Sequence, residues 1–266
     1  GTVTPKQQLG NPKPRIFRLE KDEALINRLG FNNHGSETVS RRISNNHPDG
    51  FLGINIGPNK ETKNKEEDYY ICLSRLAMHA GYITINISSP NTEGLRNFHD
   101  QEEMKKLLSG INKIINEKKI ECPVAIKISP DINDNEISKI VDLVSSHKIQ
   151  GIMVSNTTDS NRNNLSDIKK HETGGLSGQP LKDISTSLIK KFYKETKGKI
   201  KIIGVGGVDS GESAFEKITA GADAVQLYTG MVYKGPGIVK EIKKDLITIL
   251  KKENLKNVSE AVGINA

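Results

Sequence analysis

Several large classes of protein are excluded by what this sequence has little of. It contains no Trp and only two Cys, and aromatic residues make up 5% of its 266 residues. Two cysteines cannot form the disulfide framework of a small secreted domain, and neither has a CxxC partner or nearby His ligands, so we expect no metal site. No apolar run approaches the roughly 18 residues that a membrane-spanning helix needs.

The basic residues of this sequence do not have the composition or clustering that is typical of a nucleic-acid-binding surface. The formal net charge is +7, but only 8 of the 39 basic residues are Arg. Nucleic-acid surfaces usually combine clustered Arg with stacking aromatic residues. The Lys are instead scattered along helical stretches such as 190–201 and 240–252, which indicates solvated helix faces and no nucleic-acid partner. Attraction to anions or to a membrane surface is the alternative interpretation.

The chain begins at Gly1 without an initiator Met and without a signal or transit-like segment. We therefore expect that the natural protein has an N-terminal part that is missing from these residues.

Short β-rich runs alternate with amphipathic helical stretches along the chain. Apolar residues recur with helical spacing at 104–115, 137–144 and 238–249, and Asp134 is a plausible helix cap. Because parallel strands need a crossover helix between them, this order predicts a parallel sheet. The expected strands are residues 51–56, 82–87, 124–128, 151–155, 201–205 and 224–228.

Polar residues or glycines follow almost every expected strand. In an open doubly wound sheet such residues gather at one switch point, whereas in a barrel all strand ends meet at one mouth. The even distribution favours an α/β (β/α)8 TIM barrel formed by a single domain, residues 1–266. Six strands cannot close such a barrel, so we expect the first two strands to be absent along with the N-terminal extension.

Two glycine-rich segments are candidates for ligand contact. The first is 204–207, which lies between a strand and a helix and is expected to expose backbone N–H groups to an anion such as a phosphate. It does not match G-x-G-x-x-G because position 209 is Asp, and a simple tight turn is the alternative. The second is 171–180, where the density of glycines predicts a loop that approaches a ligand or moves as a lid.

Asparagine recurs at the expected strand ends, at Asn55, Asn86, Asn91 and Asn156. An amide side chain offers a donor and an acceptor together, so several of them on one rim can bind a planar ligand that carries both carbonyl and N–H groups. A set of ordinary polar turns is the alternative.

Lys127 stands out because it lies in an otherwise apolar strand, Val-Ala-Ile-Lys-Ile. Lysine is seldom buried without an anionic partner. A cation at this position could stabilise negative charge that develops on a cofactor ring or an enolate-like intermediate. A solvent-facing lysine on an edge strand is the alternative.

The sequence resembles the class 2 dihydroorotate dehydrogenases, which are associated with membranes, along essentially its whole length. The motifs that carry the resemblance are GTVTP at 1–5, NPKPR at 11–15, INRLGFN at 26–32, NISSPNT at 86–92, ETGGLSGQP at 172–180, GVGG at 204–207 and QLYT at 226–229.

The resemblance implies an FMN-dependent barrel that oxidises dihydroorotate to orotate in pyrimidine biosynthesis. A proton would leave C5 of the substrate and a hydride would pass from C6 to flavin N5. The positions that match the family's FMN contacts are Thr2, Asn55, Asn86, Lys127, Ser155, Gly178, Gly207, Tyr228 and Thr229. Many members of the family have Thr at the position of Ser155, and both residues carry a side-chain hydroxyl.

The resemblance also implies a substrate site and its catalytic residues. Ser89 matches the catalytic base, with Lys127 beside the flavin and with Thr92 and Phe31 in a proton relay. Serine at the base position is typical of class 2, since class 1 enzymes usually have Cys there. The positions that match orotate contacts are Asn27, Arg28, Leu29, Gly30, Phe31, Asn86, Asn91, Asn156 and Thr157.

The class further implies a quinone as electron acceptor, with Arg18 and Tyr228 on the quinone side. The family's N-terminal helices contact the membrane, so the resemblance implies a peripheral location on the bacterial cytoplasmic or mitochondrial inner membrane. It also leaves room for a separate N-terminal fragment that completes the barrel.

Other interpretations remain at this stage. Another FMN barrel, such as a tRNA dihydrouridine synthase or a class 1 dihydroorotate dehydrogenase, is one. Ser89 and Arg18 argue against class 1, and the scarcity of Arg and aromatic residues argues against a tRNA-binding enzyme. A non-enzymatic scaffold protein is a further interpretation. It is distinguished from a flavin enzyme by the expectation that no flavin would co-purify with it.

Overall fold

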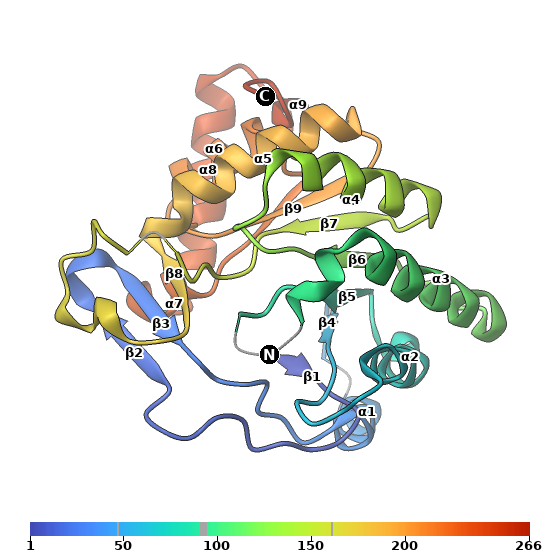
Figure 1. Ribbon diagram of the computed structural model, residues 1–266. Coiled ribbons are helices and arrows are strands. Elements are labelled where there is room, and N and C mark those ends of the chain that lie inside the picture. The colour runs from blue at the N-terminus through green and yellow to red at the C-terminus, as the bar shows by residue number, and fades with distance from the viewer. Residues whose placement is uncertain (47, 91–94, 161) are drawn as a thin grey trace.

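The computed structural model describes residues 1–46, 48–90, 95–160 and 162–266. Its main feature is a parallel sheet that curves around the centre of the molecule (Figure 1). The order of the strands is β1-β4-β5-β6-β7-β9-β10, and every neighbouring pair is parallel. The strands are β1 Thr2–Val3, β4 Gly53–Ile56, β5 Tyr82–Asn86, β6 Val124–Lys127, β7 Gly151–Val154, β9 Lys201–Val205 and β10 Ala224–Gln226.

Helices connect the strands and cover the outer face of the sheet (Figure 1). The α-helices are α1 Ser36–Asn45, α2 Lys65–Leu76, α3 Gln101–Lys118, α4 Asp134–Ser146, α5 Lys182–Thr196, α6 Gly211–Thr219, α7 Thr229–Lys234, α8 Ile238–Lys252 and α9 Val258–Ala261. Short 3₁₀ helices occupy η1 Glu20–Asp22, η2 Ala77–His79, η3 Arg96–His99, η4 Ile168–His171 and η5 Gln179–Leu181. Among the described residues, no helix is both long and apolar enough to span a membrane.

All six expected strands are present, with ends that differ by a few residues, and they pair in the predicted parallel manner. The structure adds a seventh strand, β1, which pairs in parallel with β4 through Thr2 and Val3. In the described part of the chain no strand joins β10 to β1, so the barrel is open there.

A second, antiparallel sheet lies beside the barrel and was not predicted. It contains β2 Ile16–Leu19, β3 Ala24–Asn27 and β8 Gly175–Gly178, in the order β2-β3-β8. The expectation of a loop throughout 171–180 is therefore wrong from Gly175 onward. Glycines are required in this strand because a Cβ on Gly175 would lie 2.0 Å from Thr157 Oγ1, and one on Gly178 would lie 2.3 Å from the Glu23 carbonyl oxygen.

Helix boundaries follow local capping. The Asn133 side chain accepts from the Glu136 backbone N–H, and the Glu136 carboxylate accepts from the Asn133 N–H in return. This capping box starts α4, so the N-cap is Asn133 and not Asp134 as predicted.

The two-residue period of the strands separates an apolar outer face from a polar inner face. In β5, Ile83 and Ile85 are fully buried in the core beneath the helices, whereas Tyr82, Thr84 and Asn86 line a central cavity. The same alternation recurs in β4, where Ile54 and Ile56 face the core. The core thus holds the strands in the register that presents their polar side chains inward.

The outer core makes a direct prediction about stability. Ile126 in β6 is fully buried, whereas Ile247 on α8 is 56% exposed. Replacing Ile126 with Ala should lower the free energy of unfolding by about 2–5 kcal/mol because it leaves a cavity. The matched change Ile247→Ala should alter it by less than about 0.5 kcal/mol. Urea unfolding of both variants measures the difference, and equal losses would show that β6 is not part of the core.

Candidate active site

A cavity of about 700 Å³ opens at the carboxyl ends of the parallel strands. Its volume lies within the range of small-molecule and cofactor sites. The residues predicted from the sequence that line it are Thr2, Arg18, Asn27, Leu29, Gly30, Phe31, Asn55, Asn86, Ser89, Lys127, Ser155, Asn156, Thr157, Gly178, Gly207, Tyr228 and Thr229. Residues that are far apart in the sequence are therefore brought together by the convergence of the strand ends.

A chain of hydrogen bonds joins the polar side chains on one wall of the cavity. The Thr2 hydroxyl donates to Asn55 Oδ1 at 3.0 Å, and Asn86 Nδ2 donates to the same hydroxyl oxygen at 3.1 Å. Asn156 Nδ2 donates to Asn86 Oδ1 at 3.1 Å. The chain links the ends of four strands, so each amide has a fixed orientation before any ligand arrives.

Ser89 lies in the loop that follows β5. Hydrogen bonds from neighbouring elements hold the beginning of that loop in place. The buried Tyr69 hydroxyl donates to the Asn86 carbonyl at 2.6 Å. The Ser88 hydroxyl donates to the Lys127 carbonyl at 2.7 Å and accepts from Asn156 Nδ2 at 3.0 Å. Ser89 itself is 5% exposed and lines the cavity. The structure thus presents a serine side chain that is largely shielded from bulk water, which favours its use in a proton transfer.

Lys127 ends β6 and directs its partly exposed side chain into the cavity. It forms no ion pair with any carboxylate in the described part of the chain. Burial lowers the pKa of Lys127 from its usual 10.5 to about 8. A cation that has lost solvent without gaining an anion destabilises the empty site and favours a ligand that carries negative charge.

Glycines and hydroxyl groups shape the opposite end of the cavity. Gly178, Gly206 and Gly207 have φ of +101°, +122° and +67°, which side chains rarely adopt. A Cβ on Gly207 would lie 2.5 Å from Lys182 Cβ. Beside these glycines the hydroxyls of Ser177 and Thr229 are 2.9 Å apart. The result is a concave wall of backbone and small polar groups, which suits a phosphate group.

The antiparallel sheet and the segment after β3 form the remaining wall. Asn27, Leu29, Gly30 and Phe31 line the cavity there, and Arg18 and Tyr228 also line it. Arg18 Nη2 donates to the Val232 carbonyl at 3.2 Å.

Arg28 is the one described residue of the predicted set that does not line this cavity. Its guanidinium donates to Glu172 Oε2 at 2.9 Å and stacks over the Phe17 ring. It lines a separate, more open hollow of about 800 Å³. Most residues that line that hollow belong to 159–160 and 162–174, and few of the predicted site residues reach it, so we place the chemistry in the strand-end cavity. Asn91 and Thr92 lie outside the described residues.

Sequence reasoning missed several residues of the cavity. Gln226 Nε2 donates to the Tyr82 hydroxyl at 2.6 Å deep in the barrel, and Thr84 and Ser177 also line the site. The signal for two of them was present, because Tyr82 and Thr84 share the strand face of Asn86. Ser177 could not be found this way, because its strand was taken for a loop.

The residues present fit a phosphorylated flavin. Lys127 supplies a positive charge that has no carboxylate partner among the described residues. The asparagine amides supply hydrogen-bond donors and acceptors. The backbone around Gly206 and Gly207 forms a concave surface that a Cβ would obstruct. The cation, the amide groups and the glycine wall all line the same cavity, so one bound flavin could contact all three.

A sequence model of the family described as dihydroorotate dehydrogenase matches residues 1–250. A protein from Rhodopseudomonas palustris (strain BisA53), named dihydroorotate dehydrogenase (quinone), is 43% identical over 100% of this chain and 74% of its own length. A protein of the same name from Brucella abortus (strain S19) is 45% identical over 98% of this chain and 73% of its own length.

Solved structures agree with the sequence matches. The crystal structure of DHODH from Eimeria tenella in complex with ferulenol has a TM-score of 0.94 and 39% identity, and covers 100% of this chain and 77% of that one. The ligand-free structure from the same organism has a TM-score of 0.95 and 38% identity, with 100% and 80% covered. The resemblance seen in the sequence and the barrel fold are thereby confirmed, and the chain belongs to the dihydroorotate dehydrogenase family.

Proposed function

We propose that this protein oxidises dihydroorotate to orotate in pyrimidine biosynthesis, with FMN as its bound cofactor and a quinone as electron acceptor. The observation that carries the proposal is the single cavity in which Ser89, Lys127 and the linked asparagines meet. The quinone is supported by the names of the relatives from Rhodopseudomonas palustris and Brucella abortus. Family membership leaves no support for a tRNA dihydrouridine synthase.

The residues that would hold FMN divide into two groups. Thr2, Asn55, Asn86, Lys127 and Ser155 would hold the ring, and Gly178, Gly207, Tyr228 and Thr229 would hold the phosphate. When bound, the flavin supplies a two-electron acceptor that no amino-acid side chain can replace. Lys127 would stabilise negative charge on the ring, which is the role that its unpaired cation fits best.

The substrate would lie against the amides of Asn27, Asn86 and Asn156, with Thr157 and the 28–31 segment beside them. Dihydroorotate has an imide edge with alternating carbonyl and N–H groups, and an amide side chain can pair with both. Both Nδ2 hydrogens of Asn156 are already donated to Asn86 and Ser88, so this amide would offer the substrate only its oxygen. Because its orientation is fixed beforehand, little side-chain freedom would be lost on binding.

Ser89 Oγ is proposed to remove the proton from C5 of dihydroorotate. A serine hydroxyl is a weak base in water, so it needs a site that excludes solvent and a route for the proton. Its 5% exposure supplies the first condition. For the second we propose a relay through the Thr92 hydroxyl. Phe31 lines the same cavity and would take part only through its backbone, because its ring cannot carry a proton.

Arg18 and Tyr228 are proposed to form the quinone side. Tyr228 is 69% exposed, and Ile16 and Val232 line the cavity with it, so this part of the wall is open and partly apolar. A quinone with a hydrophobic tail would reach such a site from a membrane, and we therefore propose a peripheral location on the membrane that holds the quinone pool.

The function is tested by anaerobic mixing of the purified protein with dihydroorotate while flavin absorbance is followed. The wild-type flavin should be reduced and then reoxidised by an added quinone. The variant Ser89→Ala should keep FMN bound but slow reduction by about 10²-fold or more, because the proton acceptor is gone.

The matched control is Ser145→Ala, at an exposed position on α4, which should reduce at the wild-type rate. An unchanged rate in Ser89→Ala would remove Ser89 from the mechanism. A protein that holds no flavin would instead favour a scaffold, and one that holds flavin but ignores dihydroorotate would favour a different flavin enzyme.

Lys127 gives a second prediction, because its pKa in the folded protein is lowered to about 8. The unfolded chain then binds more protons than the folded one between about pH 8 and 10.5, so the flavin-free protein should gain stability as the pH rises through that window. The variant Lys127→Met should be more stable than wild type at pH 7, and this advantage should shrink between pH 8 and 10.5. FMN affinity should fall in the same variant.

Urea unfolding of the flavin-free proteins at a series of pH values measures the difference. Lys244→Met, at an exposed position on α8, is the control and should show no such dependence. A Lys127→Met protein that is less stable than wild type at pH 7, or a difference that is constant with pH, would contradict the assignment of an unpaired cation that has lost much of its solvent.

A further inference from the structure

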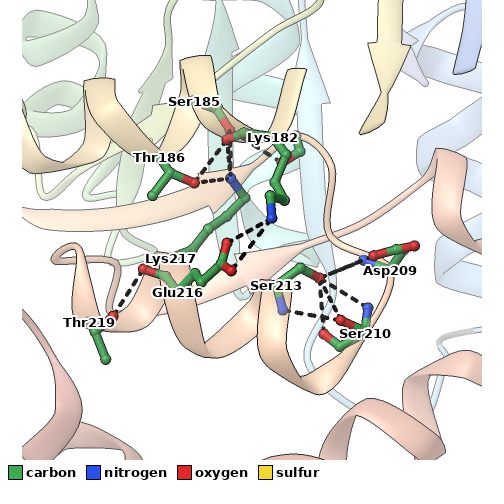
Figure 2. Close-up of polar contacts among 10 residues, drawn as sticks. Lys182, Ser185, Thr186, Asp209, Ser210, Ser213, Glu216, Lys217 and Thr219 are labelled. Carbon is green, nitrogen blue, oxygen red and sulfur yellow. Dashed lines mark hydrogen bonds and ion pairs between the residues drawn. The ribbon is translucent and has the colours of Figure 1, made fainter. Parts of the chain in front are cut away.

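A second buried lysine lies behind the glycine wall of the cavity, on the side away from the ligand. Lys217 belongs to α6 and is 0% exposed. Its ammonium donates to Ser185 Oγ at 2.6 Å, to Thr186 Oγ1 at 3.0 Å and to the Lys182 carbonyl at 3.3 Å. Figure 2 shows the three acceptors gathered around Nζ at the start of α5. All three are neutral, so the charge of Lys217 is hydrogen-bonded but not neutralised.

The charged groups near Lys217 do not supply the missing anion. Glu216 pairs with Lys182 at 3.1 Å on the surface. Glu216 and Asp183 raise the pKa of Lys217 and Lys182 lowers it, but neither carboxylate forms an ion pair with the Lys217 ammonium. Burial lowers the pKa of Lys217 to about 8. Retaining such a cation inside a protein is costly unless a negative group offsets it.

Lys217 is connected to the glycine wall through one hydroxyl. Ser185 Oγ accepts from Lys217 and lies 3.2 Å from the Gly206 carbonyl oxygen, to which it donates. The same hydroxyl is 3.2 Å from the Lys182 carbonyl, so its hydrogen is shared between the two oxygens. The Lys217 stem reaches this position beneath Gly204, where a Cβ would lie 3.3 Å from Lys217 Cβ.

The hydrogen bond that orients the Gly206 carbonyl also sets the direction of the Gly207 N–H. The peptide bond between Gly206 and Gly207 is trans, and in a trans peptide the carbonyl and the following N–H point in opposite directions. With the Gly206 oxygen held toward Ser185, the Gly207 N–H is directed to the other side of the loop. Gly207 lines the cavity, as does Thr229.

We propose that Lys217 is a positioning residue for the phosphate group of the bound flavin. Through Ser185 its ammonium holds the Gly206 carbonyl so that the Gly207 N–H faces the phosphate, and its charge acts on the phosphate dianion from behind the loop. The inference rests on the proposed function, since it concerns the same ligand. It adds a residue that does not line the cavity and that was not among the candidates in the sequence analysis.

The test compares two flavins that differ only in the phosphate. Protein purified as the cell makes it is stripped of flavin and titrated with FMN and with riboflavin, and quenching of flavin fluorescence gives both dissociation constants. In Lys217→Met the affinity for FMN should fall about tenfold, the loss expected for a charged hydrogen-bonding group. The affinity for riboflavin should change by less than about twofold, because the ring site is not altered.

Two further variants complete the test. Ser185→Ala keeps the ammonium but removes the link to Gly206, so it should lower the preference for FMN by about threefold, a part of the effect of the charged group. Lys201→Met lies at the opposite end of β9, where Lys201 pairs with Asp223, and should keep the wild-type preference. If Lys217→Met does not fold, the ratio measured for Ser185→Ala decides alone.

The outcomes separate the inference from the function on which it rests. Equal losses for the two flavins in Lys217→Met would show a purely structural lysine and would overturn the inference. An unchanged FMN preference in Ser185→Ala would do the same. A wild-type protein that binds neither flavin would overturn the proposed function, and the role of Lys217 with it.

Discussion

The convergence of parallel strand ends is the constraint on which the rest of this structure depends. Parallel strands connected by helices all point the same way, so their carboxyl ends form one rim. The two-residue period then sends Ile83 and Ile85 outward to the helices and Thr84 and Asn86 inward. A slip of one residue would exchange the two faces and empty the site of its polar groups. The apolar core and the active site are therefore specified by the same register.

The site is built at a cost to the stability of the empty protein. Lys127 and Lys217 both lose solvent without meeting a carboxylate, one facing the cavity and one behind its glycine wall. Together they place two uncompensated charges at the two ends of a cavity whose proposed ligand is anionic at its phosphate. The binding of that ligand would offset the cost, which links folding stability to cofactor binding. Such conflicts between local stability and function are typical of active sites.

Much of the fold could be predicted because each expected strand is an apolar run followed by a helix. Strand β1 was missed because only Thr2 and Val3 pair. The antiparallel sheet was missed because β8 contains two glycines, and the close approach of Thr157 and Glu23 that requires them is a tertiary contact. The residues around the cavity were foreseen from strand ends and from the family resemblance. The direction of Arg28 was not, since it depends on Glu172, which is distant in sequence.

We infer that one cavity serves both substrates in turn, with Ser89 and the asparagines on the dihydroorotate side and Arg18 and Tyr228 on the quinone side. Steady-state rates measured while dihydroorotate and quinone are varied together test it most directly. If the reduced cofactor is the only store of electrons between two separate half-reactions, double-reciprocal plots at several quinone concentrations should be parallel lines. Lines that intersect would show that both substrates must be bound at once, and would contradict their alternate use of one cavity.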